Sequence, residues 1–129
     1  MKVLALDYGA ARTGVAISDA TGTIARPLEV VERAATADGL ARLRAIVREE
    51  EAELVVVGLP LTLRGQLGMQ AQETQAFVEA LAAELPIPVT TYDERFTTTL
   101  AAGAGGSAAE DARAAAHLLE SYLRRAGGA

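Results

Sequence analysis

The stretch Val3-Leu4-Ala5-Leu6-Asp7 decides the fold of this chain. Its first four residues are apolar without alternation, a pattern typical of a central strand that is covered on both faces of its sheet. Asp7 ends the run with a charge, and burying a carboxylate without a partner is costly. The stretch therefore predicts a buried strand whose carboxyl end carries an acid that needs something cationic beside it.

Two further strands follow after short connections. Residues 13–18 alternate in polarity around Val15 and Ile17, and residues 19–22, Asp-Ala-Thr-Gly, have the Asp and Gly positions of a type I turn. Residues 23–31 read as the next strand. Because connections this short join antiparallel neighbours, the first three strands are predicted to form a meander.

After the meander, helices alternate with strands. Apolar residues recur at helical spacing in the helices, and short β-type runs separate them; the predicted segments are helix 36–51, strand 54–57, helix 66–84, strand 87–92 and a last helix from Ser107 to about Leu123. The order β-β-β-α-β-α-β-α predicts an α/β fold with a five-stranded mixed sheet and helices on both faces. We expect residues 1–129 to form one domain.

Composition narrows the function. The chain has no Cys, which excludes disulfides, thiolate zinc sites and cysteine nucleophiles. No apolar run approaches the ~18 residues of a membrane span, and the amino terminus lacks a signal-peptide pattern, so a cytoplasmic protein without membrane contact is expected. The net charge of −5 counts against general nucleic-acid binding, although steering depends on local rather than net charge.

Three acids stand where charge is unexpected. Asp7 ends a buried strand, Glu94 follows the strand-like residues 88–92, and Asp111 lies in the apolar stripe of the last helix. On a helical wheel Asp111 faces the sheet, whereas Glu110 caps the helix with Ser107 and faces water. If the first and fifth strands are parallel, Asp7 and Glu94 emerge at the edge where open α/β sheets place ligands.

Each acid also has an ordinary structural explanation. Asp7 could hydrogen-bond the backbone of the turn before Gly9. Glu94 could pair with Arg95 or another surface arginine, and Asp111 could be a first-turn acid favoured by the helix dipole. The convergence of all three favours function, and with one His and no Cys a hard divalent cation on oxygen ligands is the economical partner. Arg12 lies beside Asp7 in sequence and is a candidate phosphate contact.

These residues belong to blocks that resemble the YqgF (RuvX) family, the Holliday-junction-resolvase-like proteins described as pre-16S ribosomal RNA nucleases. The blocks come in the family's order and span nearly the whole chain; they are residues 4–9 (Leu-Ala-Leu-Asp-Tyr-Gly) with Arg12, residues 14–19, residues 56–61 (Val-Val-Gly-Leu-Pro-Leu), Asp93-Glu94-Arg95 with Thr97 and Thr98, and Asp111 with residues 119–122.

The resemblance implies an RNase H-like fold with three catalytic, metal-binding carboxylates at Asp7, Glu94 and Asp111. It implies hydrolysis of phosphodiester bonds with two Mg²⁺ or Mn²⁺ ions, Asp7 bridging them. Arg12, Arg95, Thr97 and Thr98 are the predicted substrate-binding residues. The implied role is 5′-end maturation of pre-16S ribosomal RNA in the cytoplasm, with ribosome association and either a monomer or a homodimer.

Alternatives stay open at this point. Junction resolution is the older proposal for the family, and a weakly active nucleic-acid or ribosome-associated binding module is the non-enzyme alternative. The chain departs from the family at Thr62 and Arg64-Gly65, and the segment between Arg95 and Arg113 has no basic residue. An Asp-x-Gly after a buried strand also opens actin-like kinases and ATPases, but those close two such domains around ATP.

Overall fold

The three amino-terminal strands form the predicted antiparallel meander. They are β1 (Val3–Asp7), β2 (Arg12–Ser18) and β3 (Ala25–Glu32). The structure is a computed structural model that describes residues 1–97 and 107–127. β1 pairs with β2, and β2 with β3, both antiparallel. The three glycines of residues 101–106 predict a loop between the fifth strand and the last helix, and this segment lies outside the described residues.

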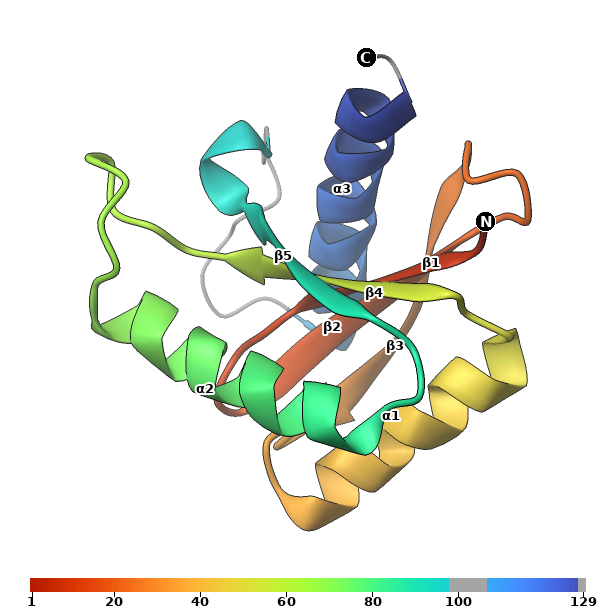
Figure 1. Cartoon of the computed structure of the whole chain (residues 1–129), viewed down its shortest axis with the longest axis horizontal. Helices are drawn as coiled ribbons and strands as arrows, with labels where there is room; N and C mark the ends of the chain where they lie inside the picture. The colour runs from red at the N-terminus through yellow and green to blue at the C-terminus, as the bar shows by residue number, and fades with distance from the viewer. Residues whose placement is uncertain (98–106, 128–129) are drawn as a thin grey trace.

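Two parallel strands complete the sheet on the other side of β1. β4 (Leu54–Leu59) pairs in parallel with β1, and β5 (Val89–Asp93) pairs in parallel with β4. Within the described residues the sheet has five strands in the order β3-β2-β1-β4-β5 (Figure 1). The predicted mixed sheet is confirmed, and β1 is its central strand, as its unbroken apolar run indicated.

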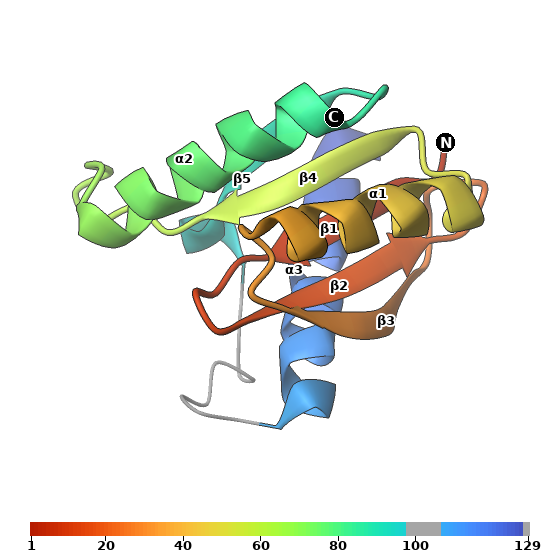
Figure 2. The ribbon, with the colours of Figure 1, turned by 90° about the horizontal axis from the view of Figure 1, so that it is seen from below.

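Helices cover both faces of the sheet. α1 (Ala37–Glu50) and α2 (Met69–Glu84) lie on one face and α3 (Ala108–Gly127) on the other (Figure 2). Thr36 caps α1 by accepting a hydrogen bond from the Gly39 N–H at 3.2 Å, as a threonine at this position commonly does.

Two helix boundaries differ from the prediction by more than one residue. α2 begins at Met69 rather than at residue 66, because Thr62 accepts N–H bonds from Gly65 and Gln66 and holds a turn there. α3 runs to Gly127, beyond the predicted end near Leu123. Arg124 and Arg125 in its last turn interact favourably with the negative end of the helix dipole and help to stabilise the longer helix.

The core has two layers of different character. Large side chains of the sheet, among them Leu4, Leu6 and Ile17, pack against α1 and α2. The opposite layer contains more small residues. Ala5 and Ala16, which are paired across β1 and β2, belong to the same buried cluster as Ala115 and Ala116 of α3. Small side chains on both surfaces let α3 approach the sheet closely.

No helix within the described parts of the chain is long and apolar enough to cross a membrane.

Candidate metal and catalytic site

The carboxyl ends of β1, β4 and β5 place two of the predicted acids together. Asp7 is the last residue of β1, and Glu94 follows β5 directly. In the parallel register Leu6 lies beside Val57 and Gly58 lies beside Tyr92, so Gly58 occupies the strand between the two acids.

Gly58 makes room for the Glu94 side chain. A Cβ atom on Gly58 would lie 2.8 Å from Glu94 Cγ and 2.9 Å from both Cδ and Oε1, closer than real side-chain atoms approach. Glycine within a strand often marks such a close approach. The absence of a side chain therefore lets Glu94 lie over β4 and reach the carboxylate of Asp7.

A second glycine brings in the helix that carries the third acid. Gly14 is the register partner of Asp7 on β2, and a Cβ atom there would overlap the main-chain carbonyl of Asp111. The first turn of α3 therefore lies directly against β2 beside Asp7. The charge of Asp111 is close enough to raise the pKa of Asp7.

Asp7 and Glu94 form a hydrogen-bonded carboxyl pair. Burial raises the pKa of Glu94 to about 8, and the charge of Asp7 and the hydrogen bond between them act in the same direction. Burial also raises the pKa of Asp7, while the hydrogen bond from Glu94 opposes that rise. At neutral pH the pair thus holds a proton on Glu94, which donates to the Asp7 carboxylate.

Asp111 is held by an arginine. Its Oδ2 atom lies 2.9 Å from Arg12 Nε in an ion pair. The same oxygen is buried and, within the described residues, makes no aligned hydrogen bond. Arg12, predicted from the sequence as a phosphate contact, therefore lies at the predicted edge and contacts one of the three acids there.

The chemistry of these oxygens fits a divalent cation. Without a cation, the two carboxyl groups lie together by sharing a proton. When they are deprotonated, they are hard anionic oxygen donors, the kind that Mg²⁺ and Mn²⁺ prefer. Among residues 1–97 and 107–127 no three or more His, Cys, Asp or Glu side chains are grouped closely enough to hold one ion. Asp7 and Glu94 are together, Asp111 is beside them, and the role of the three as ligands stays a prediction.

Arg95, the other predicted phosphate contact, lies at the same edge but is occupied. Its Nη2 atom is 2.6 Å from Asp93 Oδ2, and its Nη1 donates to the Leu63 carbonyl oxygen at 3.3 Å. The hydrogen bond from Arg95 lowers the pKa of Asp93. The alternative in which Glu94 pairs with Arg95 is therefore wrong, because Asp93 takes that partner.

The two predicted threonines are placed unequally. Thr97 ends the short 3-10 helix η1 (Glu94–Phe96), and its Oγ1 atom is buried without a hydrogen-bond partner among the described residues. Thr98 lies outside the described residues.

Sequence reasoning did not single out Ser121, Gly14 or Gly58 as site residues. Ser121 is 2% exposed on α3. It lies ten residues after Asp111, roughly a quarter turn away at about 100° per residue, so the helical wheel carried a signal for its burial. The glycines carried the weaker signal of a Gly inside a strand pattern.

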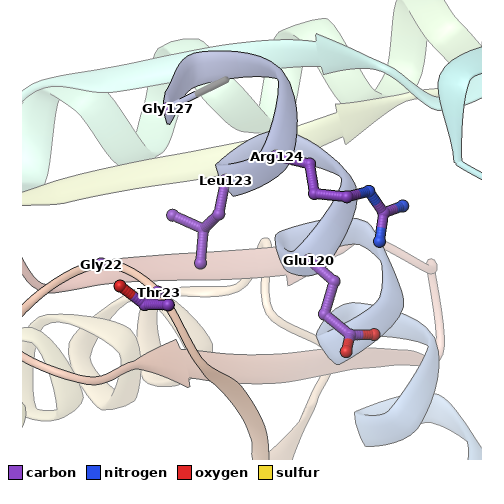
Figure 3. Close-up of a pocket in the computed structure, with 6 residues that line it drawn as sticks. All are labelled: Gly22, Thr23, Glu120, Leu123, Arg124 and Gly127. Carbon is purple, nitrogen blue, oxygen red and sulfur yellow. The ribbon is translucent and has the colours of Figure 1, made fainter.

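A surface hollow of about 440 Å³ lies elsewhere, between the β2–β3 turn and the end of α3. Figure 3 shows Leu123 pointing toward Gly22 and Thr23, with Glu120 and Arg124 beside it. Because Met1 bonds Ala20 in this turn, the hollow lies at the amino-terminal end of β1, away from Asp7. The candidate site therefore lies at the carboxyl ends of β1 and β5 and not in this hollow.

Comparisons with known proteins agree with this architecture. A Thermus thermophilus RuvC solved in complex with a Holliday junction substrate is similar in structure, with a TM-score of 0.62 over 99% of this chain and 97% of that chain at 19% identity. A second RuvC structure from that organism gives a TM-score of 0.57. The likeness identifies the sheet and its helices as an RNase H-like fold.

Sequence relatives cover almost the whole chain. A Rubrobacter xylanophilus protein is 44% identical over 99% of this chain and 96% of its own length, and a Moorella thermoacetica protein is 39% identical over 98% and 97%. Each carries the name "Putative pre-16S rRNA nuclease". The family model described as "RuvX: Holliday junction resolvase" matches residues 1–125, and the chain belongs to this family.

Proposed function

We propose that this chain is a metal-dependent nuclease that hydrolyses phosphodiester bonds at the edge formed by β1, β4 and β5. The observation that carries the proposal is the partly buried, hydrogen-bonded pair of Asp7 and Glu94 beside Asp111. A fold has no structural need for acids that oppose each other's ionisation, and such pairs gather at functional sites. The family and the names of the relatives support a nuclease.

Asp7, Glu94 and Asp111 would hold Mg²⁺ or Mn²⁺, with two ions as the finer proposal. Bound ions would activate the attacking water and stabilise the leaving oxygen. The residues of the chain set the conditions for this. Glu94 has to release its proton to bind a cation, and Asp111 has to exchange part of its contact with Arg12 for the ion.

Arg12 and Arg95 would contact phosphates of the substrate in different ways. Arg12 is half-buried beside Asp111, so its guanidinium is in place to contact a phosphate next to the scissile bond. Arg95 is exposed but bonded to Asp93 and to Leu63, so it contacts phosphate only with the donors that these bonds leave over. Thr97 and Thr98 complete the proposed substrate-binding set.

The proposed substrate is the precursor of 16S ribosomal RNA, the molecule in the names of the relatives. With this substrate the protein would act in the cytoplasm, in contact with nucleic acid and the maturing ribosome. Junction resolution is the second candidate, favoured by the description of the family. The net charge of −5 predicts weak binding to either substrate.

A cleavage assay on three labelled substrates tests the proposal. Single-stranded RNA, a structured ribosomal RNA precursor and a four-way DNA junction are incubated with Mg²⁺, with Mn²⁺ and with EDTA, each beside Asp111→Asn. Metal-dependent cleavage that disappears in the variant supports the nuclease and ranks its substrates. Folded protein that binds but cleaves none of them would instead identify a binding module.

A further inference from the structure

One hydroxyl group on α3 contacts both sides of the segment that carries Glu94. Ser121 Oγ lies 2.7 Å from the hydroxyl oxygen of Tyr92, two residues before Glu94. It also lies 3.0 Å from the carbonyl oxygen of Phe96, two residues after Glu94. Residues 92–96 are thus fixed to the helix at both ends, with the acid in the middle.

The direction of the two hydrogen bonds follows from their partners. The Phe96 carbonyl oxygen can only accept, so the Ser121 hydroxyl donates to it. The Tyr92 hydroxyl must then donate to Ser121 Oγ. Ser121 itself is 2% exposed, and removing its hydroxyl takes away the hydrogen-bond partner that the Tyr92 hydroxyl and the Phe96 carbonyl share.

Ring contacts hold the same segment in place. Tyr92 meets Tyr122 of α3 edge-on, with centroids 5.6 Å apart and planes at 88°. The Arg125 guanidinium carbon lies 3.8 Å above the Phe96 ring. These ring contacts hold the segment against α3. The hydrogen bonds of Ser121 are more directional, so we assign to them the position of the segment along the helix and its orientation.

α3 thereby connects two of the acids. Asp111 lies in its first turn, and Ser121 follows ten residues later, about 15 Å along a rigid helix at 1.5 Å per residue. The helix is seated on β2 at one end by Gly14 and holds the Glu94 segment nearer the other end. A shift of that segment would move Glu94 while leaving Asp7 and Asp111 in place.

We propose that Ser121 is a positioning residue that sets the Glu94 carboxyl group against Asp7 through Tyr92 and the Phe96 carbonyl. The functional part of this inference rests on the proposed nuclease activity, whereas the placement of Glu94 by Ser121 does not. Ser121 touches neither the substrate nor the reacting atoms. Residues that orient metal-binding side chains in this way typically change affinity or activity about 10- to 100-fold when they are removed.

The test compares two buried serines in the full-length protein. Ser121→Ala removes the proposed positioning group, and Ser18→Ala is the matched control. Ser18 is also 2% exposed and also accepts a buried hydrogen bond, from the Val3 N–H at 2.8 Å, but it lies at the opposite end of the sheet. Tyr92→Phe is a milder second variant that keeps the ring and the bond from Ser121 to Phe96.

Two readouts separate the inference from the proposed function. The ¹³C resonance of the Glu94 side-chain carboxyl, recorded without metal, reports its placement. The Kd for Mn²⁺ alone, measured by calorimetry with Asp7→Asn as a reference, reports the metal site. We expect Ser121→Ala to shift the Glu94 resonance and to weaken Mn²⁺ binding about 10-fold or more, Tyr92→Phe to do so less, and Ser18→Ala to do neither.

An unchanged Glu94 resonance in both Ser121→Ala and Tyr92→Phe would overturn the inference, whatever the Mn²⁺ result. A resonance that moves equally in Ser18→Ala would also overturn it, because general destabilisation would then explain the change. If Mn²⁺ fails to bind even the wild-type protein, the proposed function fails, and the resonance alone decides whether Ser121 places Glu94.

Discussion

Replacing Glu94 by Gln should flatten the dependence of the protein's stability on pH in the absence of metal. The folded protein holds a proton on Glu94 with a pKa of about 8, against 4.5 for an ordinary glutamate. Between these values the unfolded chain binds fewer protons than the folded one, so the free energy of unfolding falls as pH rises. Stability from this group is full below about pH 4.5 and is lost as pH passes about 8.

The size of the effect follows from the same interval. Each pH unit within it contributes at most about 1.4 kcal/mol, so from about pH 5 to pH 8 the wild-type protein should lose up to about 4 kcal/mol through Glu94. Glu94→Gln keeps the shape and an N–H donor toward Asp7 but has no proton to lose. Because burial also raises the pKa of Asp7, the variant should keep a smaller slope of the same sign.

The assay is urea unfolding in EDTA at about pH 5, 6, 7 and 8 for the wild-type protein, Glu94→Gln and a control. Glu73→Gln serves as the control because Glu73 is exposed on α2. In plots of the free energy of unfolding against pH, the account predicts that the curves converge at low pH. As pH rises, the wild type should lose more stability than Glu94→Gln, and Glu73→Gln should follow the wild type. Parallel curves for all three proteins would refute the shared proton.

Two further variants test the packing around the site. Gly58→Ala should displace the Glu94 side chain, because the new Cβ atom would lie 2.8 Å from it, and cleavage should fall about 100-fold. Gly68→Ala is the control and should cleave normally, because its Cβ atom would lie 3.4 Å from its nearest neighbour. Equal activities would show that Gly58 does not make room for the acid. Arg95→Gln should release the loop that Arg95 holds through the Leu63 carbonyl, and limited chymotrypsin digestion should then cut the chain faster after Leu63; an unchanged rate would contradict this role for Arg95.

The sequence predicted the fold because its signals were local. The unbroken apolar run of residues 3–6 indicated a central strand, and the short connections after it indicated a meander; both are confirmed. Asp7 and Glu94 could be placed together because carboxyl ends of parallel strands share an edge.

What could not be predicted depends on contacts between distant residues. The ion pair of Arg12 with Asp111 requires α3 to lie on β2 at Gly14, which no periodicity shows. The link from Ser121 to the Glu94 segment requires the 3-10 helix after β5, which the sequence did not predict. Helix ends were predicted to within a few residues, since caps and turns decide them.

The most direct test of the central claim is a crystal structure of the protein soaked with Mn²⁺, with the ion located by its anomalous scattering. The account predicts Mn²⁺ bound by Asp7 and Glu94, with an Asp111 oxygen turned from Arg12 toward the ion. A well-ordered site at this edge without anomalous signal, in crystals held above about pH 8 where Glu94 has released its proton, would contradict the assignment of these acids as metal ligands.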